Sequence, residues 1–96
     1  MNERDVHTDP EKLVKKHPQL VHSDMLTVIS HVQRNAGDWI INTLMIDGCS
    51  APFRFKRKQP YRNLKGQRVN LTYYPVNETV GGIEFEIMNV VRIRIA

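Results

Sequence analysis

In several stretches between residue 53 and residue 95, apolar side chains recur at every second position. Phe53 and Phe55 alternate with Arg54 and Lys56, and the same period returns in the stretches that follow. Because an extended strand turns successive side chains to opposite faces, this period predicts strands with one buried and one solvent-facing side. It favours antiparallel β-structure for this part of the chain.

Turn residues divide the region into four predicted strands. Asp47-Gly48 follows the first, Gln59-Pro60 the second, and Gly81-Gly82 separates the third from the last. The strands are expected at 39–46, 53–58, 67–74 and 83–95. Because the last is longer than the usual limit of about ten residues, we expect a bend or break near Met88-Asn89, which gives a fifth strand or one strongly coiled strand.

The N-terminal part carries helix signals instead. Residues 1–8 show no period and are expected to form a flexible tail. Asp9-Pro10 is typical of a helix start, and His17-Pro18 of a helix end, which predicts a short helix over 10–17.

A second helix is predicted over 24–35. Ser23 can cap its start and Gly37 can end it. An apolar stripe recurs at helical spacing, formed by Met25, Val28, Ile29 and Val32.

These elements predict a mainly β fold with an N-terminal helical part, in the α+β class. One domain is expected over 9–96, with its helical part at 9–36 and its antiparallel part at 38–96. We expect a small five-stranded antiparallel barrel or a strongly curved meander, with one or two helices before it. The missing helix signal between the third and fourth strands favours an SH3-like meander over an OB-like barrel, and an open sheet is the main alternative.

Charge is divided unevenly along the chain. Residues 1–50 contain five Lys/Arg and seven Asp/Glu, whereas residues 51–96 contain nine and three. A basic half favours a polyanionic partner. The single cysteine, Cys49, excludes an internal disulfide and favours a reducing, cytoplasmic setting. No stretch has the roughly 18 apolar residues of a membrane span, so no membrane partner is expected.

Motifs for catalysis are missing from the sequence. It has no Gly-rich phosphate loop, no nucleophile elbow and no zinc-binding helix motif, and Cys49 has no neighbouring histidine to activate it. Glu84 and Glu86 are expected on a solvated strand face, paired with arginines of neighbouring strands (Arg68, Arg92 or Arg94). The histidines follow no metal-ligand spacing: His7, His17, His22 and His31. We therefore expect no enzyme, no cofactor and no metal.

The basic stretch PFRFKRKQPYR at 52–62 is the best candidate for a binding site. If the strands at 53–58 and 67–74 pair as a hairpin, their outward cations form one surface that can neutralise phosphates, while Phe53 and Phe55 point inward. Tyrosines on this surface can stack on bases. The predicted nucleic-acid-binding residues are Arg54, Lys56, Lys58, Tyr61, Arg62, Lys65, Arg68 and Tyr74. Trp39 is expected to pack in the core or against an opening of the barrel as a lid.

Two functions follow from this pattern. The first is a non-catalytic small β-barrel module that binds RNA or single-stranded DNA through the basic face of its second and third strands. The alternative is a protein-interaction or homodimerising domain without a nucleic-acid ligand, in which the acidic N-terminal half covers the basic sheet of its own chain or of a second copy. A basic outer face is also common in domains with neither function.

Overall fold

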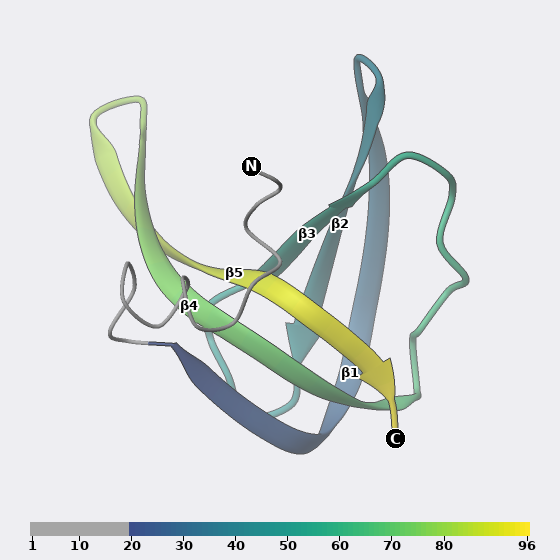
Figure 1. Cartoon of the computed structure of the whole chain (residues 1–96). Coiled ribbons are helices and arrows are strands. Elements are labelled where there is room, and N and C mark those ends of the chain that lie inside the picture. Colours follow the sequence, from purple (N-terminus) through teal and green to yellow (C-terminus); the bar gives the residue numbers. More distant parts are fainter. Residues whose placement is uncertain (1–19) are drawn as a thin grey trace, which may run out of the picture.

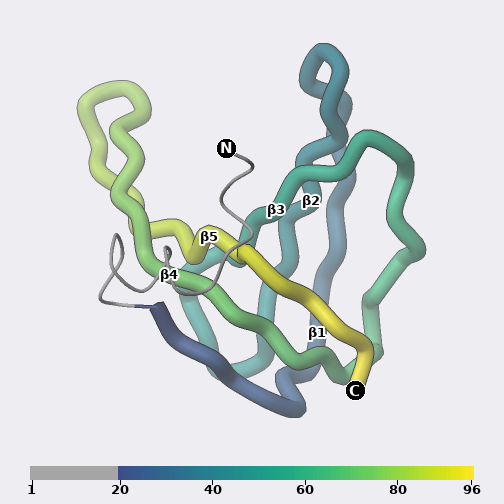
Figure 2. The backbone as a smooth tube through the Cα atoms, viewed as in Figure 1, coloured from purple at the N-terminus to yellow at the C-terminus, as the bar shows by residue number. Residues whose placement is uncertain are grey.

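A computed structural model describes residues 20–96 of the chain (Figures 1 and 2). The tail predicted at 1–8 and the helix predicted at 10–17 lie outside these residues. Residues 20–96 contain five strands and no helix. The strands are β1 (Val21–Ala36), β2 (Trp39–Ile46), β3 (Phe53–Arg57), β4 (Arg68–Val80) and β5 (Ile83–Ile95).

The five strands form one closed barrel in the order β1-β2-β3-β5-β4. β1 pairs with both β2 and β4, which closes the ring, and β3 runs parallel to β5 while all other pairs are antiparallel. The predicted pairing of 53–58 with 67–74 is therefore wrong, because β5 lies between these two segments. The prediction of a simple, wholly antiparallel meander fails at the same place.

The helix predicted over 24–35 is also wrong, since these residues belong to β1. The pairing of β1 skips a residue twice, once around Met25 and once at Ile29. Each extra residue displaces the two-residue alternation of the strand. The bulges therefore produce apolar residues at helical spacing, although only Val28 of that stripe is buried. Ser23 does not cap a helix; its Oγ lies 2.9 Å from the hydroxyl oxygen of Tyr73.

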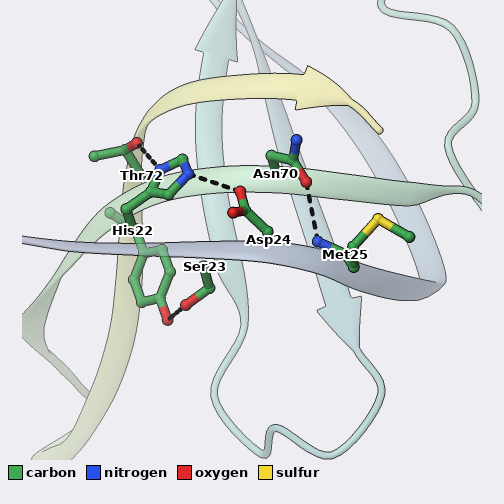
Figure 3. A network of polar contacts seen from close by, with 7 residues as sticks. His22, Ser23, Asp24, Met25, Asn70 and Thr72 are labelled. Carbon is green, nitrogen blue, oxygen red and sulfur yellow. Dashed lines mark hydrogen bonds and ion pairs between the residues drawn. The ribbon is translucent and has the colours of Figure 1, made fainter.

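The bulge at Met25 lies just before the point where β1 changes partner. β1 pairs with β4 up to Thr27, two residues after Met25, and from Val28 onward it pairs with β2. Met25 has a φ of 59°, in the left-handed region that side chains other than glycine rarely adopt. Its N–H donates a 2.9 Å hydrogen bond to Oδ1 of Asn70 on β4 (Figure 3). The bulge turns β1 through the corner that closes the barrel.

Two glycine-containing turns end the long hairpins. Gly37-Asp38 links β1 to β2, and Gly81-Gly82 links β4 to β5, with positive φ at all three glycines. A two-residue turn of this kind matches the twist of paired strands. Both hairpin tips extend beyond the barrel toward the same end of the molecule (Figure 1).

The core confirms the inward direction of the two phenylalanines of β3. Phe53 and Phe55 are 1% and 3% exposed. They belong to one cluster with residues of all five strands and of the β3–β4 loop: Val28, Leu44, Ile46, Leu64, Val69, Leu71 and Val90. Burying side chains of this size is the main source of stability for a chain of this length.

β4 is longer than the predicted strand at 67–74, whereas β5 has the predicted bounds but is interrupted at a different residue. β4 continues through Pro75, which lies opposite Met88 of β5. On its other side, β4 pairs with β1 only up to Tyr73, so Pro75 lies beyond the β1–β4 pairing. A proline, which has no N–H to donate, is tolerated at such an edge position. β5 is one strand, and its irregularity comes after the predicted Met88-Asn89, where Val91 is left without a partner. This bulge exchanges the two faces of β5: Met88 and Val90 face the core before it, and Ile93 faces the core after it.

Candidate nucleic-acid interface

A row of four outward side chains crosses the sheet between the two hairpins. Arg54 on β3 lies opposite Thr43 on β2 and Asn89 on β5, and Asn89 lies opposite Tyr74 on β4. Directly opposed residues share a face. Since Phe53 and Phe55 on either side of Arg54 point into the core, this row lies on the outer face. The Nδ2 group of Asn89 donates a 2.6 Å hydrogen bond to the hydroxyl oxygen of Tyr74, which is half-buried.

Further cations extend this row toward the tip of the β1–β2 hairpin. Lys56 lies opposite Ile41 on β2, and Ile41 lies opposite Arg34 on β1. Both cations are exposed. Arg34 was not among the predicted site residues, because its segment was interpreted as a helix. In the strand, its parity places it on the same face as Lys56.

Trp39 ends the outer face at the hairpin tip, which corrects its expected place in the core. It pairs with Ala36 next to the turn and is 41% exposed. The ammonium Nζ of Lys58 lies 4.8 Å from the centre of its ring, within the range of a cation–π interaction. The residues on this side of the sheet are named here the cationic face: Arg34, Trp39, Thr43, Arg54, Lys56 and Lys58.

Tyr61 does not belong to the cationic face. Its ring packs edge-on against Phe55, with a centroid distance of 5.4 Å, and Arg57 lies over both rings. The side-chain amide of Gln33 hydrogen-bonds to both the N–H and the C=O of Tyr61. The predicted stacking role of Tyr61 therefore has no support in this arrangement, because its ring and backbone hold the β3–β4 loop against β1.

The same loop carries two more of the predicted cations away from β3. Leu64 is fully buried, and its N–H donates to Nδ1 of His31, leaving Nε2–H of that ring to donate to Oδ1 of Asn42. Gly66 then bonds to the carbonyl of Val28 on β1. The loop thus follows β1, with its cations exposed there: Arg62 and Lys65. Arg68 begins β4 opposite Thr27 of β1.

The predicted site is therefore divided in two. The structure brings four members together on the outer side of β3, β5 and β4: Arg54, Lys56, Lys58 and Tyr74. It places the other cations beside β1: Arg62, Lys65 and Arg68. Because the predicted hairpin does not form, no pairing joins the two groups. The sequence holds a signal for the outward position of Trp39. It has the same parity as Ile41 and Thr43 along β2 and directly follows the Gly37-Asp38 turn, which is typical of a hairpin tip.

One ion pair lies on the outer face. The guanidinium of Arg54 contacts the carboxylate of Glu78 from the β4–β5 hairpin through both of its terminal nitrogens, with Nη1 at 3.3 Å from Oε1. This hydrogen bond, opposed by partial desolvation and aided by the charge of Arg54, holds the pKa of Glu78 below its ordinary value of 4.5. Among residues 20–96, no other lysine or arginine has a carboxylate partner.

The cross-strand ion pairs expected for Glu84 and Glu86 do not form. Glu84 lies opposite Thr79, and Glu86 lies opposite Asn77, within the β4–β5 hairpin. The arginines proposed as their partners lie at the other end of the sheet, two of them opposite Thr72 and Asn70: Arg92 and Arg94. The cations of the predicted site are consequently not neutralised by these two glutamates.

Groups with other chemistry are few in the described part of the chain. Residues 20–96 contain no cluster of three or more His, Cys, Asp or Glu that could hold a metal ion. Cys49 is a free, exposed thiol in the loop between β2 and β3. His22 contacts Thr72 and Asp24 through its two ring nitrogens, at 2.8 and 2.7 Å (Figure 3). His7 and His17 lie outside the described residues.

The chain matches no protein-family model, no curated protein and no solved structure. Over residues 20–96, no helix has the length and apolar character needed to cross a membrane.

Proposed function

We propose that this chain is a non-catalytic OB-like barrel that binds RNA or single-stranded DNA through the cationic face. Barrels of the OB type bind oligonucleotides on the face of their second and third strands, between the β1–β2 and β4–β5 loops. The strand order β1-β2-β3-β5-β4 and the parallel pairing of β3 with β5 support an OB-like rather than an SH3-like barrel.

The proposal depends most on one observation: Lys56, Lys58 and Arg34 share a face with the exposed ring of Trp39, and none of them has a carboxylate partner. Cations of this kind release counterions when they neutralise phosphates, which favours binding of any sequence. An aromatic ring beside them can stack on a base, because every base has a π-face. A neutral oligosaccharide would use the ring but not the cations.

A protein-interaction or self-associating domain is the second candidate, supported by the β4–β5 hairpin. Val80, Ile83 and Phe85 are 59%, 61% and 48% exposed and lie on one side of this hairpin. Adjacent exposed apolar side chains are typical of a surface that binds a partner. A second copy of the chain would bury them without any nucleic acid.

Titration of a labelled oligonucleotide separates the two candidates. Unstructured DNA and RNA of about 15 nucleotides match the length that one OB barrel covers. We expect binding at low salt that weakens as salt rises, with a slope of about −2 in log K against log[salt] if three phosphates are neutralised. No binding, together with a dimer in a sizing experiment on the free protein, would favour the interaction domain.

A further inference from the structure

Arg54 differs from the other cations of the cationic face because its guanidinium is already occupied. It lies at the centre of the outer row, between Thr43 and Asn89, and its side chain is 28% exposed. Lys56, near the end of β3, and Lys58, just after it, have no carboxylate partner. A phosphate that follows the outer face of β3 would therefore meet two ammonium groups without a carboxylate partner and one guanidinium bound to Glu78.

Glu78 reaches Arg54 from a different strand pair. Tyr74, Val76 and Glu78 alternate along β4 on the outer side, so Glu78 lies on the same face as Tyr74 but further along the hairpin. Its two carboxylate oxygens face the two terminal nitrogens of Arg54. Two oxygens of a phosphodiester can occupy the same positions, because a guanidinium binds carboxylate and phosphate with the same forked geometry.

The contact between the two side chains is replaceable. The Glu78 side chain is 44% exposed, so water reaches the carboxylate when it leaves Arg54. Ion pairs with this exposure have a small net free energy, because solvent stabilises the separated charges nearly as well. The glutamate side chain can rotate away without any change in the backbone pairing of the hairpin.

We propose that Arg54 is a phosphate-binding subsite for single-stranded nucleic acid and that Glu78 occupies it as an internal competitor in the free protein. This inference rests on the proposed function. Binding then exchanges one anion for another at Arg54, whereas Lys56 and Lys58 gain a new one. Glu78 lowers the affinity for nucleic acid and reduces the contribution of Arg54 to the salt dependence.

The test compares Glu78→Gln with Glu84→Gln, using the labelled oligonucleotide of about 15 nucleotides. Both variants remove one negative charge from the same hairpin, but Glu84 alternates with Phe85 and so lies on the opposite face. We expect Glu78→Gln to tighten binding by about two- to fivefold, the range that corresponds to an exposed ion pair. Glu84→Gln reports the weaker, screened effect of charge alone.

Two further variants make the result specific. Glu78→Asp keeps the charge but shortens the side chain, so it should also tighten binding if reach to Arg54 matters. In an Arg54→Ala background, Glu78→Gln should tighten binding no more than Glu84→Gln does. Thermal unfolding of each variant checks that it is folded.

The outcomes distinguish failure of the internal competitor from failure of the proposed nucleic-acid function. Salt-dependent binding with equal effects of Glu78→Gln and Glu84→Gln, or an undiminished effect without Arg54, would overturn the internal competitor and leave the nucleic-acid function standing. If neither the natural protein nor any variant binds, the proposed function fails and the subsite fails with it.

Discussion

The nitrogen of the Met25 N–H lies 2.9 Å from Oδ1 of Asn70, at the bulge in the pairing of β1 with β4, two residues before the last residue of β1 that pairs with β4. This side-chain bond replaces a ladder hydrogen bond at a residue that the bulge takes out of register. It satisfies the backbone donor of a methionine held at a positive φ. The closure of the barrel therefore depends on a local conformation that a different residue could adopt more easily.

Met25→Gly should stabilise the protein. Glycine adopts a positive φ without the clash of a Cβ atom, and the methionine side chain is 55% exposed, so little packing is lost. We expect the free energy of unfolding in urea to rise by about 0.5–1 kcal/mol. A loss of about 1 kcal/mol would instead contradict the positive φ of Met25, because glycine destabilises the interior of a regular strand or helix.

Leu64→Ala should be strongly destabilising. Leu64 is fully buried and fills the core from the β3–β4 loop. The cavity left by the truncation should cost about 2–5 kcal/mol in the free energy of unfolding. Lys65→Ala, one residue along the same loop, is the control and should change it by less than about 0.5 kcal/mol. Similar values for both would show that the loop does not seal the core.

The ion pair of Glu78 with Arg54 predicts a dependence of stability on pH. Because the pKa of Glu78 is lowered in the folded state, the pair stabilises the fold above the ordinary pKa of 4.5, and this contribution is lost as the pH falls through the lowered value. Glu78→Gln should therefore be less stable than the natural protein near neutral pH, and the difference should disappear in acid, once the pH has fallen through the lowered pKa of Glu78. A difference that persists in acid would show that the carboxylate charge is not responsible.

Trp39 offers a direct signal, since it is the only tryptophan in the chain. If bases stack on its exposed ring, addition of the oligonucleotide should quench its fluorescence. Trp39→Ala should weaken binding by about 1–3 kcal/mol, the range measured for base–aromatic contacts. Trp39→Phe, which keeps a ring, should retain most of the affinity. Binding without quenching, and unchanged by Trp39→Ala, would place the bases elsewhere.

Local periodicity was sufficient to predict part of this structure. The bounds of β2 and the inward direction of Phe53 and Phe55 follow from alternation within a single strand, and the structure agrees with both. The outward direction of Lys56 follows from the same rule. Each of these features depends only on neighbours in sequence, which a strand places on fixed sides.

Features that depend on distant pairing could not be predicted in this way. The parallel contact of β3 with β5 joins Arg54 to Asn89, 35 positions apart, and no local pattern indicates it. In β1, the bulges at Met25 and Ile29 imitate a helical period. The candidate site changed accordingly: Lys65 and Arg68 belong beside β1, while Arg34 and Trp39 join the cationic face.

The most direct test of the cationic face compares two double variants that remove equal charge. Lys56→Ala/Lys58→Ala alters the outer side of β3, and Lys65→Ala/Arg68→Ala alters the side next to β1. Oligonucleotide affinity is measured for both across a range of salt concentrations. We predict that the first pair lowers the salt slope by about 1.4, as expected for two lost phosphate contacts, and that the second pair leaves it nearly unchanged. Equal losses from both pairs, or a larger loss from Lys65→Ala/Arg68→Ala, would contradict binding at the cationic face.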